Sequence, residues 1–181
     1  MIQLRPHQQT IIDTLHENSK GQIIVPTGGG KTFCMIKDTQ REFNSCNWDV
    51  VLSDPDRKTI VIVAPRILLS QQLCEDFIEH LDINPMLQYK VLHVHSGDTH
   101  HESTTNSDTI IQWNKDNYRF NKLIFTTYHS LNRIQEADIS VDTIYFDEAH
   151  NSVQKNFIEA VEYHSIYANR CYFFTATPKH S

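Results

Sequence analysis

Short apolar runs rich in Val, Ile and Phe alternate along the chain with segments of helical periodicity. Some runs are apolar almost without interruption, which is typical of strands that are covered on both faces of a parallel sheet. The alternation predicts an α/β fold with a doubly wound, mainly parallel sheet and helices on both faces. The expected strands are Gln22–Val25, Thr59–Ala64, Lys90–His95, Lys122–Thr126, Thr143–Phe146 and Cys171–Phe174. The expected helices are Pro6–Asn18, Lys31–Phe43, Ile67–Leu81, Tyr128–Gln135 and Val153–Tyr163.

Two polar stretches interrupt this alternation. Asn44–Lys58 contains the turn signal Asp54-Pro55-Asp56, and Ser96–Asp108 is rich in Ser, Thr, Asp and His. Both stretches are expected to be loops. The chain shows no internal repeat and no long linker, so residues 1–181 are predicted to form a single domain.

A glycine-rich segment between a strand and a helix predicts a phosphate-binding loop. Gln22–Val25 runs directly into this segment, which is the context that a P-loop requires, although Val25 stands where the common pattern begins with Gly or Ala. Glycines let backbone N–H groups approach phosphates, and the helix N-terminus favours negative charge. The alternative is a glycine-rich turn without a ligand. The residues expected to bind ATP are Pro26, Thr27, Gly28, Gly29, Gly30, Lys31 and Thr32, with Lys31 on the phosphates and Thr32 also on Mg²⁺.

An acidic pair follows the strand Thr143–Phe146. Carboxylates at the carboxyl end of a parallel strand lie at the ligand-binding edge of the sheet. We expect Asp147 to hold Mg²⁺ and Glu148 to orient and deprotonate the attacking water, with Lys31 as the second catalytic residue. An acidic pair alone would more simply be a solvated strand end. The upstream P-loop favours the catalytic interpretation.

These motifs, in this order, resemble the first RecA-like domain of superfamily 2 helicases and translocases over nearly the whole chain. The P-loop corresponds to motif I, and the letters Asp-Glu-Ala-His at Asp147–His150 correspond to motif II. The opening Leu4-Arg5-Pro6-His7-Gln8 looks like the adenine-binding segment of these enzymes. The resemblance therefore implies that Arg5 and Gln8 bind the nucleotide, with Gln8 on the adenine edge.

The same resemblance assigns contacts with nucleic acid. Ala64–Gln72 looks like motif Ia and Thr126-Thr127-Tyr128 like motif Ib, so Pro65, Arg66 and Thr127 are expected near a nucleic-acid backbone. Thr175-Ala176-Thr177-Pro178 looks like motif III. The residues that the resemblance implies in coupling nucleotide state to nucleic acid are His150, Thr175 and Thr177.

The layout is most similar to the type III restriction subunit group, which includes phage and viral DNA helicases. RecQ helicases are the second choice, because they share the opening through Lys31. RecQ proteins, however, carry an aromatic-rich loop after motif II, whereas Asn151–Phe157 holds a single aromatic residue. The favoured group makes DNA a more probable partner than RNA.

The chain stops shortly after the motif III segment. By resemblance, a second RecA-like domain would supply the arginine finger, so we expect this chain alone to bind nucleotide, to hydrolyse it slowly and to unwind nothing. The alternative, from a different class, is a nucleotide-switched nucleic-acid-binding module without turnover.

Composition limits the partners and the compartment. The formal net charge of −6 indicates that any nucleic-acid site is small or shared, since dedicated nucleic-acid-binding domains are usually basic. The sequence shows neither a signal peptide nor an apolar run that would span a membrane. Its four cysteines form no C-x-x-C pair and are interpreted as free thiols, which suggests an intracellular protein. The isolated domain is expected to be a monomer.

Histidines are concentrated near one predicted strand end. His93, His95, His100, His101 and Glu102 lie within ten residues, so a metal site is one interpretation. The long polar loop does not by itself predict a fixed ligand geometry. We interpret the cluster as a histidine-bearing strand end followed by a solvated loop.

Overall fold

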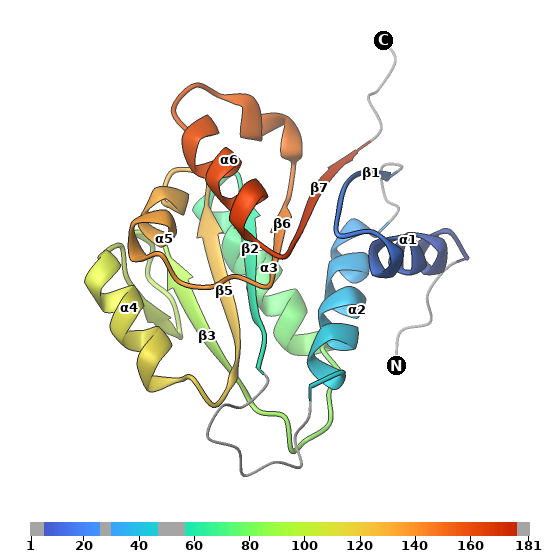
Figure 1. The fold of residues 1–181 in the computed structure, drawn as a ribbon, viewed down its shortest axis with the longest axis horizontal. Coiled ribbons are helices and arrows are strands. Elements are labelled where there is room, and N and C mark those ends of the chain that lie inside the picture. Colours follow the sequence, from blue (N-terminus) through green and yellow to red (C-terminus); the bar gives the residue numbers. More distant parts are fainter. Residues whose placement is uncertain (1–5, 26–29, 47–56, 177–181) are drawn as a thin grey trace.

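The computed structural model describes residues 6–25, 30–46 and 57–176 and shows strands flanked by helices (Figure 1). The described strands form a seven-stranded sheet in the order β1-β7-β6-β2-β5-β3-β4, and all of its pairs are parallel. This confirms the predicted doubly wound α/β class. The strands are β1 Lys20–Val25, β2 Thr59–Ala64, β3 Tyr89–Val94, β4 Glu102–Ser103, β5 Asn121–Thr127, β6 Thr143–Phe146 and β7 Arg170–Ala176. The helices are α1 Pro6–Glu17, α2 Lys31–Asn44, α3 Ile67–His80, α4 Ser107–Asp116, α5 Leu131–Ala137, the short 3₁₀ helix η1 Ala149–Val153 and α6 Ile158–Tyr167.

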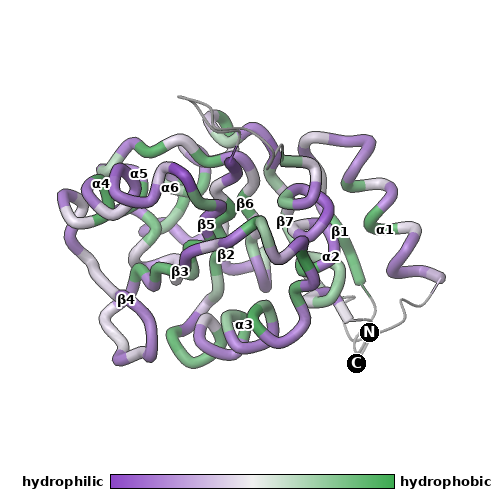
Figure 2. The backbone as a smooth tube through the Cα atoms, turned by 90° about the horizontal axis from the view of Figure 1, so that it is seen from below, coloured by the Kyte–Doolittle hydropathy of each residue, from purple (hydrophilic) through white to green (hydrophobic). Residues whose placement is uncertain are grey.

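The helices cover both faces of the sheet. Figure 1 and Figure 2 show α4, α5 and α6 on one face and α2 and α3 on the other, with α1 beside α2. Alternate residues of β2 therefore enter two separate cores. Val61 and Val63 pack with the α4–α6 helices, whereas Ile60 and Ile62 pack with α1, α2 and α3. All four residues are fully buried, which explains why this strand is apolar throughout.

The expectation that Ser96–Asp108 is a loop is wrong at its C-terminal end. Within this segment β4 pairs with β3, and α4 begins at Ser107. Asn106 caps the helix, because its side chain accepts a hydrogen bond of 3.1 Å from Thr109 N–H. Polar capping residues are common in loops and at helix starts alike, so composition did not separate the two. The buried Ile110 and Trp113 anchor the helix on the sheet.

The sequence also misplaced the last helix. A helix was expected from Val153, but the segment after β6 first forms η1, and α6 begins only at Ile158. Phe157 is buried between them and packs against the ring of Tyr128, with the ring centroids 5.8 Å apart. Packing of this aromatic residue on the sheet therefore separates the two helices.

The parallel register brings several strand ends to one edge of the sheet. Val25 at the end of β1 is opposite Ala176 in β7, and Ala64 at the end of β2 is opposite Thr127 in β5. Phe146 at the end of β6 is opposite Val63 in β2. The segments that follow β1, β2, β5 and β6 therefore share this edge, which is the usual ligand-binding edge of such sheets.

A buried polar network ties α2 to the sheet. Arg170 at the start of β7 has Nη2 2.7 Å from Asp38 Oδ1 and Nη1 3.0 Å from Glu42 Oε1. The hydroxyl of Tyr145 donates a hydrogen bond to the other Asp38 oxygen. Burial opposes the charge on Arg170, but the hydrogen bond and attraction from Asp38 outweigh it and raise the pKa of the guanidinium. This network fixes the helix that begins with Lys31.

None of the helices in the described ranges combines the length and the apolar character that a membrane crossing needs. All four cysteines lie in the described ranges and are buried as thiols.

Candidate nucleotide-binding site

The structure brings Lys31 and the acidic pair together at the shared edge of the sheet. Lys31 is the first residue of α2 and follows β1 in the chain, whereas Asp147 and Glu148 follow β6. Lys31 Nζ lies 2.9 Å from Asp147 Oδ1 and donates a hydrogen bond to Glu148 Oε1. The two predicted halves of the site, which are distant in sequence, therefore meet at one ammonium group.

Burial and charge oppose each other at this site. Burial disfavours the charged form of Lys31, but attraction to Asp147 and Glu148 outweighs burial and raises the pKa of the ammonium group. Burial raises the pKa of the Asp147 carboxyl, although the attraction of Lys31 works against this shift. A cation beside Asp147 would reverse that shift. The site therefore suits a ligand that brings both phosphate for Lys31 and a cation for Asp147.

One oxygen of Asp147 is suited to a metal ion. Asp147 Oδ1 is buried and lies 2.9 Å from the ammonium group of Lys31. When Lys31 turns to a phosphate, this oxygen loses that partner, and Mg²⁺ prefers oxygen ligands. Thr32, the other expected ligand, lies half-buried in the first turn of α2. These residues fit a magnesium ion.

The backbone of Asp147 is fixed by two hydrogen bonds. Asp147 N–H donates to Val63 O at 2.8 Å, and the buried Tyr128 hydroxyl donates to Asp147 O at 2.8 Å. This role of Tyr128 was not predicted from the sequence. The available signal was an aromatic residue next to the motif Ib threonines, but its partner depends on the pairing of β5, β2 and β6.

Glu148 adopts an unusual backbone conformation. Its φ of 49° and ψ of 57° lie in the left-handed region, which costs a non-glycine residue about 1–3 kcal/mol and is commonest at functional sites. Asn151 Nδ2 donates a hydrogen bond of 2.9 Å to Glu148 O and supports the turn. The exposed His150 has Nδ1 3.8 Å from Glu148 Oε2. The turn aims Glu148 at Lys31 rather than into solvent.

Gly30 and Gln8 are in contact at the start of α2. Gly30 has φ of 75°, and a Cβ added there would lie 2.1 Å from Gln8 Nε2. Gln8 is 4% exposed, and its Nε2 donates a long hydrogen bond of 3.4 Å to Gly30 O. The backbone angle therefore favours glycine, and a larger residue would also displace the end of the Gln8 side chain. This contact places the predicted adenine-binding residue beside the predicted phosphate loop.

The predicted nucleic-acid residues lie at the same edge of the sheet. Pro65 and Arg66 follow β2, and Arg66 is exposed at the N-terminus of α3. Thr127 ends β5 in register with Ala64 but is only 3% exposed. The side chain of Arg66 is thus the accessible one of the three, together with part of Pro65.

Thr175, one of the predicted coupling residues, is the penultimate residue of β7 and pairs with Ile24, the penultimate residue of β1. His150 is exposed beside Glu148, as given above. The expectations for Arg5, Pro26, Thr27, Gly28, Gly29 and Thr177 lie outside the described residues.

The fold and the family match identify a RecA-like, ATP-binding domain of the superfamily 2 helicase and translocase type. The sequence model of the family described as "Type III restriction enzyme, res subunit" matches residues 1–180, and the chain belongs to this family. This match confirms the predicted resemblance to the type III restriction subunit group, which was favoured over the RecQ helicases. No curated protein matches the chain.

Solved structures show the same fold. A nuclease-deletion mutant of the Type ISP restriction-modification enzyme LlaGI is 25% identical with a TM-score of 0.80, and the match covers 99% of this chain and 18% of that chain. The Hef helicase domain of Pyrococcus furiosus is 18% identical with a TM-score of 0.65, over 98% of this chain and 33% of that chain. The UvsW helicase of bacteriophage T4 is 13% identical with a TM-score of 0.65, over 97% and 52% respectively. This chain thus spans about a fifth to a half of the length of these proteins.

Proposed function

We propose that this domain couples ATP hydrolysis to movement on DNA as one part of a longer protein. One observation carries the proposal: the single ammonium group of Lys31 contacts both Asp147 and Glu148 at the carboxyl edge of a RecA-like sheet. Phosphoryl transfer needs little covalent chemistry from the protein beyond positioning and neutralisation of charge. A lysine and two acidic residues at one point meet that need.

Each residue has a separate role in this proposal. Lys31 leaves its carboxylate partners to bind the β and γ phosphates of ATP. Asp147 and Thr32 hold Mg²⁺, which when bound neutralises charge on the phosphate oxygens. Glu148, free of Lys31, accepts a proton from the attacking water and orients it. Gln8, whose Nε2 donates a hydrogen bond to Gly30 O, contacts the adenine edge.

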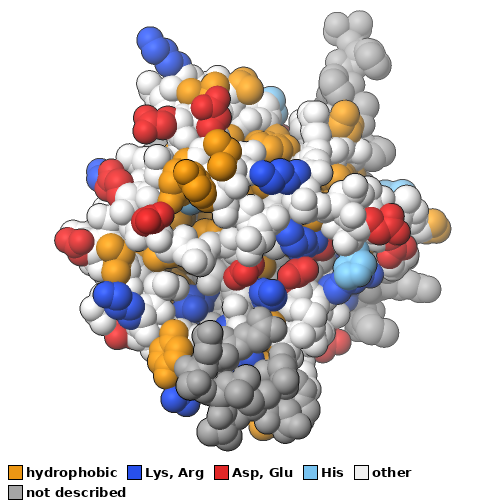
Figure 3. All heavy atoms as spheres, in the orientation of Figure 1, with side chains coloured by type: hydrophobic (Ala, Val, Ile, Leu, Met, Phe, Trp, Pro, Cys, Tyr) orange, Lys and Arg blue, Asp and Glu red, His pale blue; other side chains and the backbone are white. Residues whose placement is uncertain are grey.

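Contact with DNA is expected to be local. Lys and Arg side chains are interspersed with Asp and Glu over the face in Figure 3, so that face carries no broad field of one sign. The exposed Arg66 at the N-terminus of α3 supports a phosphate contact without sequence readout. The choice of DNA is supported by the LlaGI structure, which is described as a complex with a DNA substrate mimic.

A second RecA-like domain is part of the proposal. In such engines an arginine from the facing domain speeds hydrolysis by orders of magnitude. The share of the LlaGI chain that the match covers, 18%, supports a larger assembly. We therefore expect this 181-residue chain alone to bind ATP and to hydrolyse it slowly.

The phosphate assignment is tested on the chain itself. Lys31→Ala removes charge-assisted hydrogen bonds and is expected to weaken ATP–Mg²⁺ binding roughly 10- to 100-fold, as measured by calorimetry. Lys37→Ala is the matched control, because Lys37 lies on the same helix and contacts Gln40 instead of the acidic pair. Equal affinity of the two variants would remove Lys31 from the phosphate site.

The hydrolytic role is tested in the natural full-length protein. Glu148→Gln should leave ATP binding intact and reduce DNA-stimulated turnover about 10²- to 10⁴-fold, since it removes the general base. Glu162→Gln, at an exposed position on α6, serves as the control. Normal turnover with Glu148→Gln would refute the role of Glu148. ATP and DNA binding without any turnover in the unmodified protein would instead favour a nucleotide-switched binding module.

A further inference from the structure

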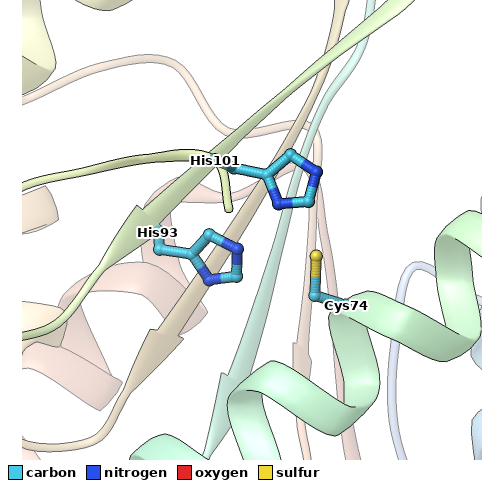
Figure 4. Close-up of side chains that lie close together, drawn as sticks. All are labelled: Cys74, His93 and His101. Atoms are coloured by element: carbon cyan, nitrogen blue, oxygen red, sulfur yellow. The ribbon is translucent and has the colours of Figure 1, made fainter. Parts of the chain in front are cut away.

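Three metal-ligating side chains converge at a second position, on elements distinct from those that carry Lys31 and the acidic pair. Cys74 comes from α3, His93 from β3 and His101 from the segment before β4, and in Figure 4 the three side chains point toward one another. One ligand atom of each lies within 4.8 Å of the others. We propose that this cluster binds a zinc-type divalent ion through one thiolate and two imidazoles. The inference is independent of the proposed ATPase function.

To hold the ion, the ligand atoms must come closer together, and the His101 ring must turn out of its stacked arrangement with His93. Zinc–sulfur and zinc–nitrogen bonds of about 2.0–2.3 Å place tetrahedral ligands roughly 3.5 Å apart. Cys74 and His93 are buried at 2% exposure each, whereas His101 is exposed. The two fixed ligands therefore stay in place, and the His101 side chain supplies the adjustment. A mixed thiolate and imidazole set favours zinc over magnesium or calcium.

The surroundings leave room for an ion and a fourth ligand. A cavity of about 320 Å³ is lined by Cys74, His93 and His101 together with Gln71, Glu75, Asp98, Thr99 and His100. Gln71 on α3 already donates a hydrogen bond of 2.7 Å to Asp98 O, so the segment before β4 is held against α3. With three protein ligands, the fourth position is open to water.

The second ring nitrogen of His93 contacts His95. His95 Nε2 lies 3.2 Å from His93 Nδ1, and Gly97 N–H donates to His95 Nδ1 at 3.1 Å. Metal-binding histidines commonly hydrogen bond through their second nitrogen. When the ion occupies Nε2 of His93, its ring proton must lie on Nδ1 and point at His95. His95 then accepts this proton at Nε2 and carries its own ring proton on Nδ1, so Gly97 N–H can no longer donate to Nδ1. Metal binding should therefore change the environment of the Gly97 amide.

Burial acts in opposite directions on the two buried ligands: it favours the neutral His93 ring that an ion needs and disfavours the Cys74 thiolate. Burial, with contributions from His95 and His101, lowers the pKa of His93 to about 4, so this ring is neutral at physiological pH. Burial, with the charge of Glu75, raises the pKa of Cys74 to about 12. The thiol proton must therefore leave as the ion binds, which a bound zinc-type ion brings about directly.

The expected result of loading is a cross-link between separate elements. Cys74 lies two turns into the helix that begins beside Arg66, and β3 is a neighbour of β5 in the sheet. An ion at this position ties α3, β3 and the start of β4 together. Its role would therefore be to fix α3 and the segment before β4, rather than to catalyse a reaction.

The test is a Co²⁺ titration of the reduced, tag-free 181-residue chain, followed by its absorption spectrum. Cobalt replaces zinc in tetrahedral sites, and a bound thiolate gives a charge-transfer band in the near ultraviolet. Co²⁺ at the oxygen ligands of Asp147 and Thr32 gives no such band. We expect a saturable thiolate band that one equivalent of Zn²⁺ abolishes. A spectrum without the band would overturn the proposal.

Variants assign the band to individual residues. Cys74→Ser should remove it, and His101→Ala, at an exposed position that folding does not require, should weaken Co²⁺ binding strongly. His16→Ala, at an exposed position on α1, is the matched control. His100→Ala tests the neighbouring histidine, which lines the same cavity but is not one of the three converging ligands, and it should keep the band. His95→Ala should keep the band and weaken affinity about 10- to 100-fold. A band that survives Cys74→Ser, or that depends on His100 and not on His101, would refute the assignment.

Discussion

Replacement of Asp38 by alanine provides a direct test of how α2 is anchored. The Asp38 side chain is 1% exposed and accepts a hydrogen bond from Tyr145 in addition to its ion pair with Arg170. Loss of one partner from a buried ion pair costs about 3–5 kcal/mol, because the other charge stays buried without compensation. Here Glu42 Oε1 remains 3.0 Å from Arg170, so we expect the lower end of that range, about 3 kcal/mol.

Glu42→Ala is the comparison that isolates this effect. It removes the other charged partner of Arg170 but leaves Asp38 in place, and the Glu42 side chain is 17% exposed and already partly solvated. We expect a loss of about 1 kcal/mol. Urea unfolding of both variants at pH 7, followed by circular dichroism, gives the free energies of unfolding, provided that the m-values agree. A loss below about 1 kcal/mol for Asp38→Ala, or a larger loss for Glu42→Ala, would refute the reasoning.

Two further predictions concern buried side chains on the side of the sheet that α4, α5 and α6 cover. Tyr128→Phe removes the hydroxyl that donates to Asp147 O but keeps the ring, so it should lower the free energy of unfolding by about 1–2 kcal/mol. The control Tyr118→Phe, at a more exposed position, should change it by less than about 0.5 kcal/mol. Equal urea midpoints for the two variants would contradict this prediction. Burial lowers the pKa of His164 to about 4 from 6.5, despite the backbone hydrogen bond with Leu131, so protonation favours the unfolded chain. The free energy of unfolding therefore falls as pH falls from 6.5 to 4, by up to about 3 kcal/mol from this group. In urea titrations between pH 7 and 4.5, His164→Gln should lose less of this free energy than the unmodified chain. Parallel pH profiles of the two proteins would contradict the prediction.

Much of the fold was predictable because buried strands leave a strong local signal. The strands Thr59–Ala64 and Thr143–Phe146 agree with β2 and β6 to the residue, since every side chain in them is buried. The signal weakens where polar residues serve as helix caps. The helix from Ser107 was missed for that reason, because its anchors Ile110 and Trp113 are too few to stand out in a polar stretch.

The site was predictable to the extent that it depends on strand ends. Lys31, Asp147 and Glu148 each lie close behind an apolar strand, and parallel pairing then forces them to one edge. Tyr128 and Cys74 were not assigned because their partners come from elements that only the three-dimensional packing brings together. The histidines stand out because they are close together in the sequence, whereas Cys74, the sulfur ligand on α3, is distant from them in the sequence.

The position of β1 has a consequence for how this protein is made. Among the described strands, β1 pairs with β7 alone, through contacts such as Lys20 with Cys171 that join residues roughly 150 positions apart. A ribosome releases the strand that leads to Lys31 early, but that strand has no partner until the last of the seven emerges. The central strands β2, β5 and β6 can pair first. Pairing of β1 with β7 should therefore be a late, slow event in folding, and the ability to bind ATP should appear only after it.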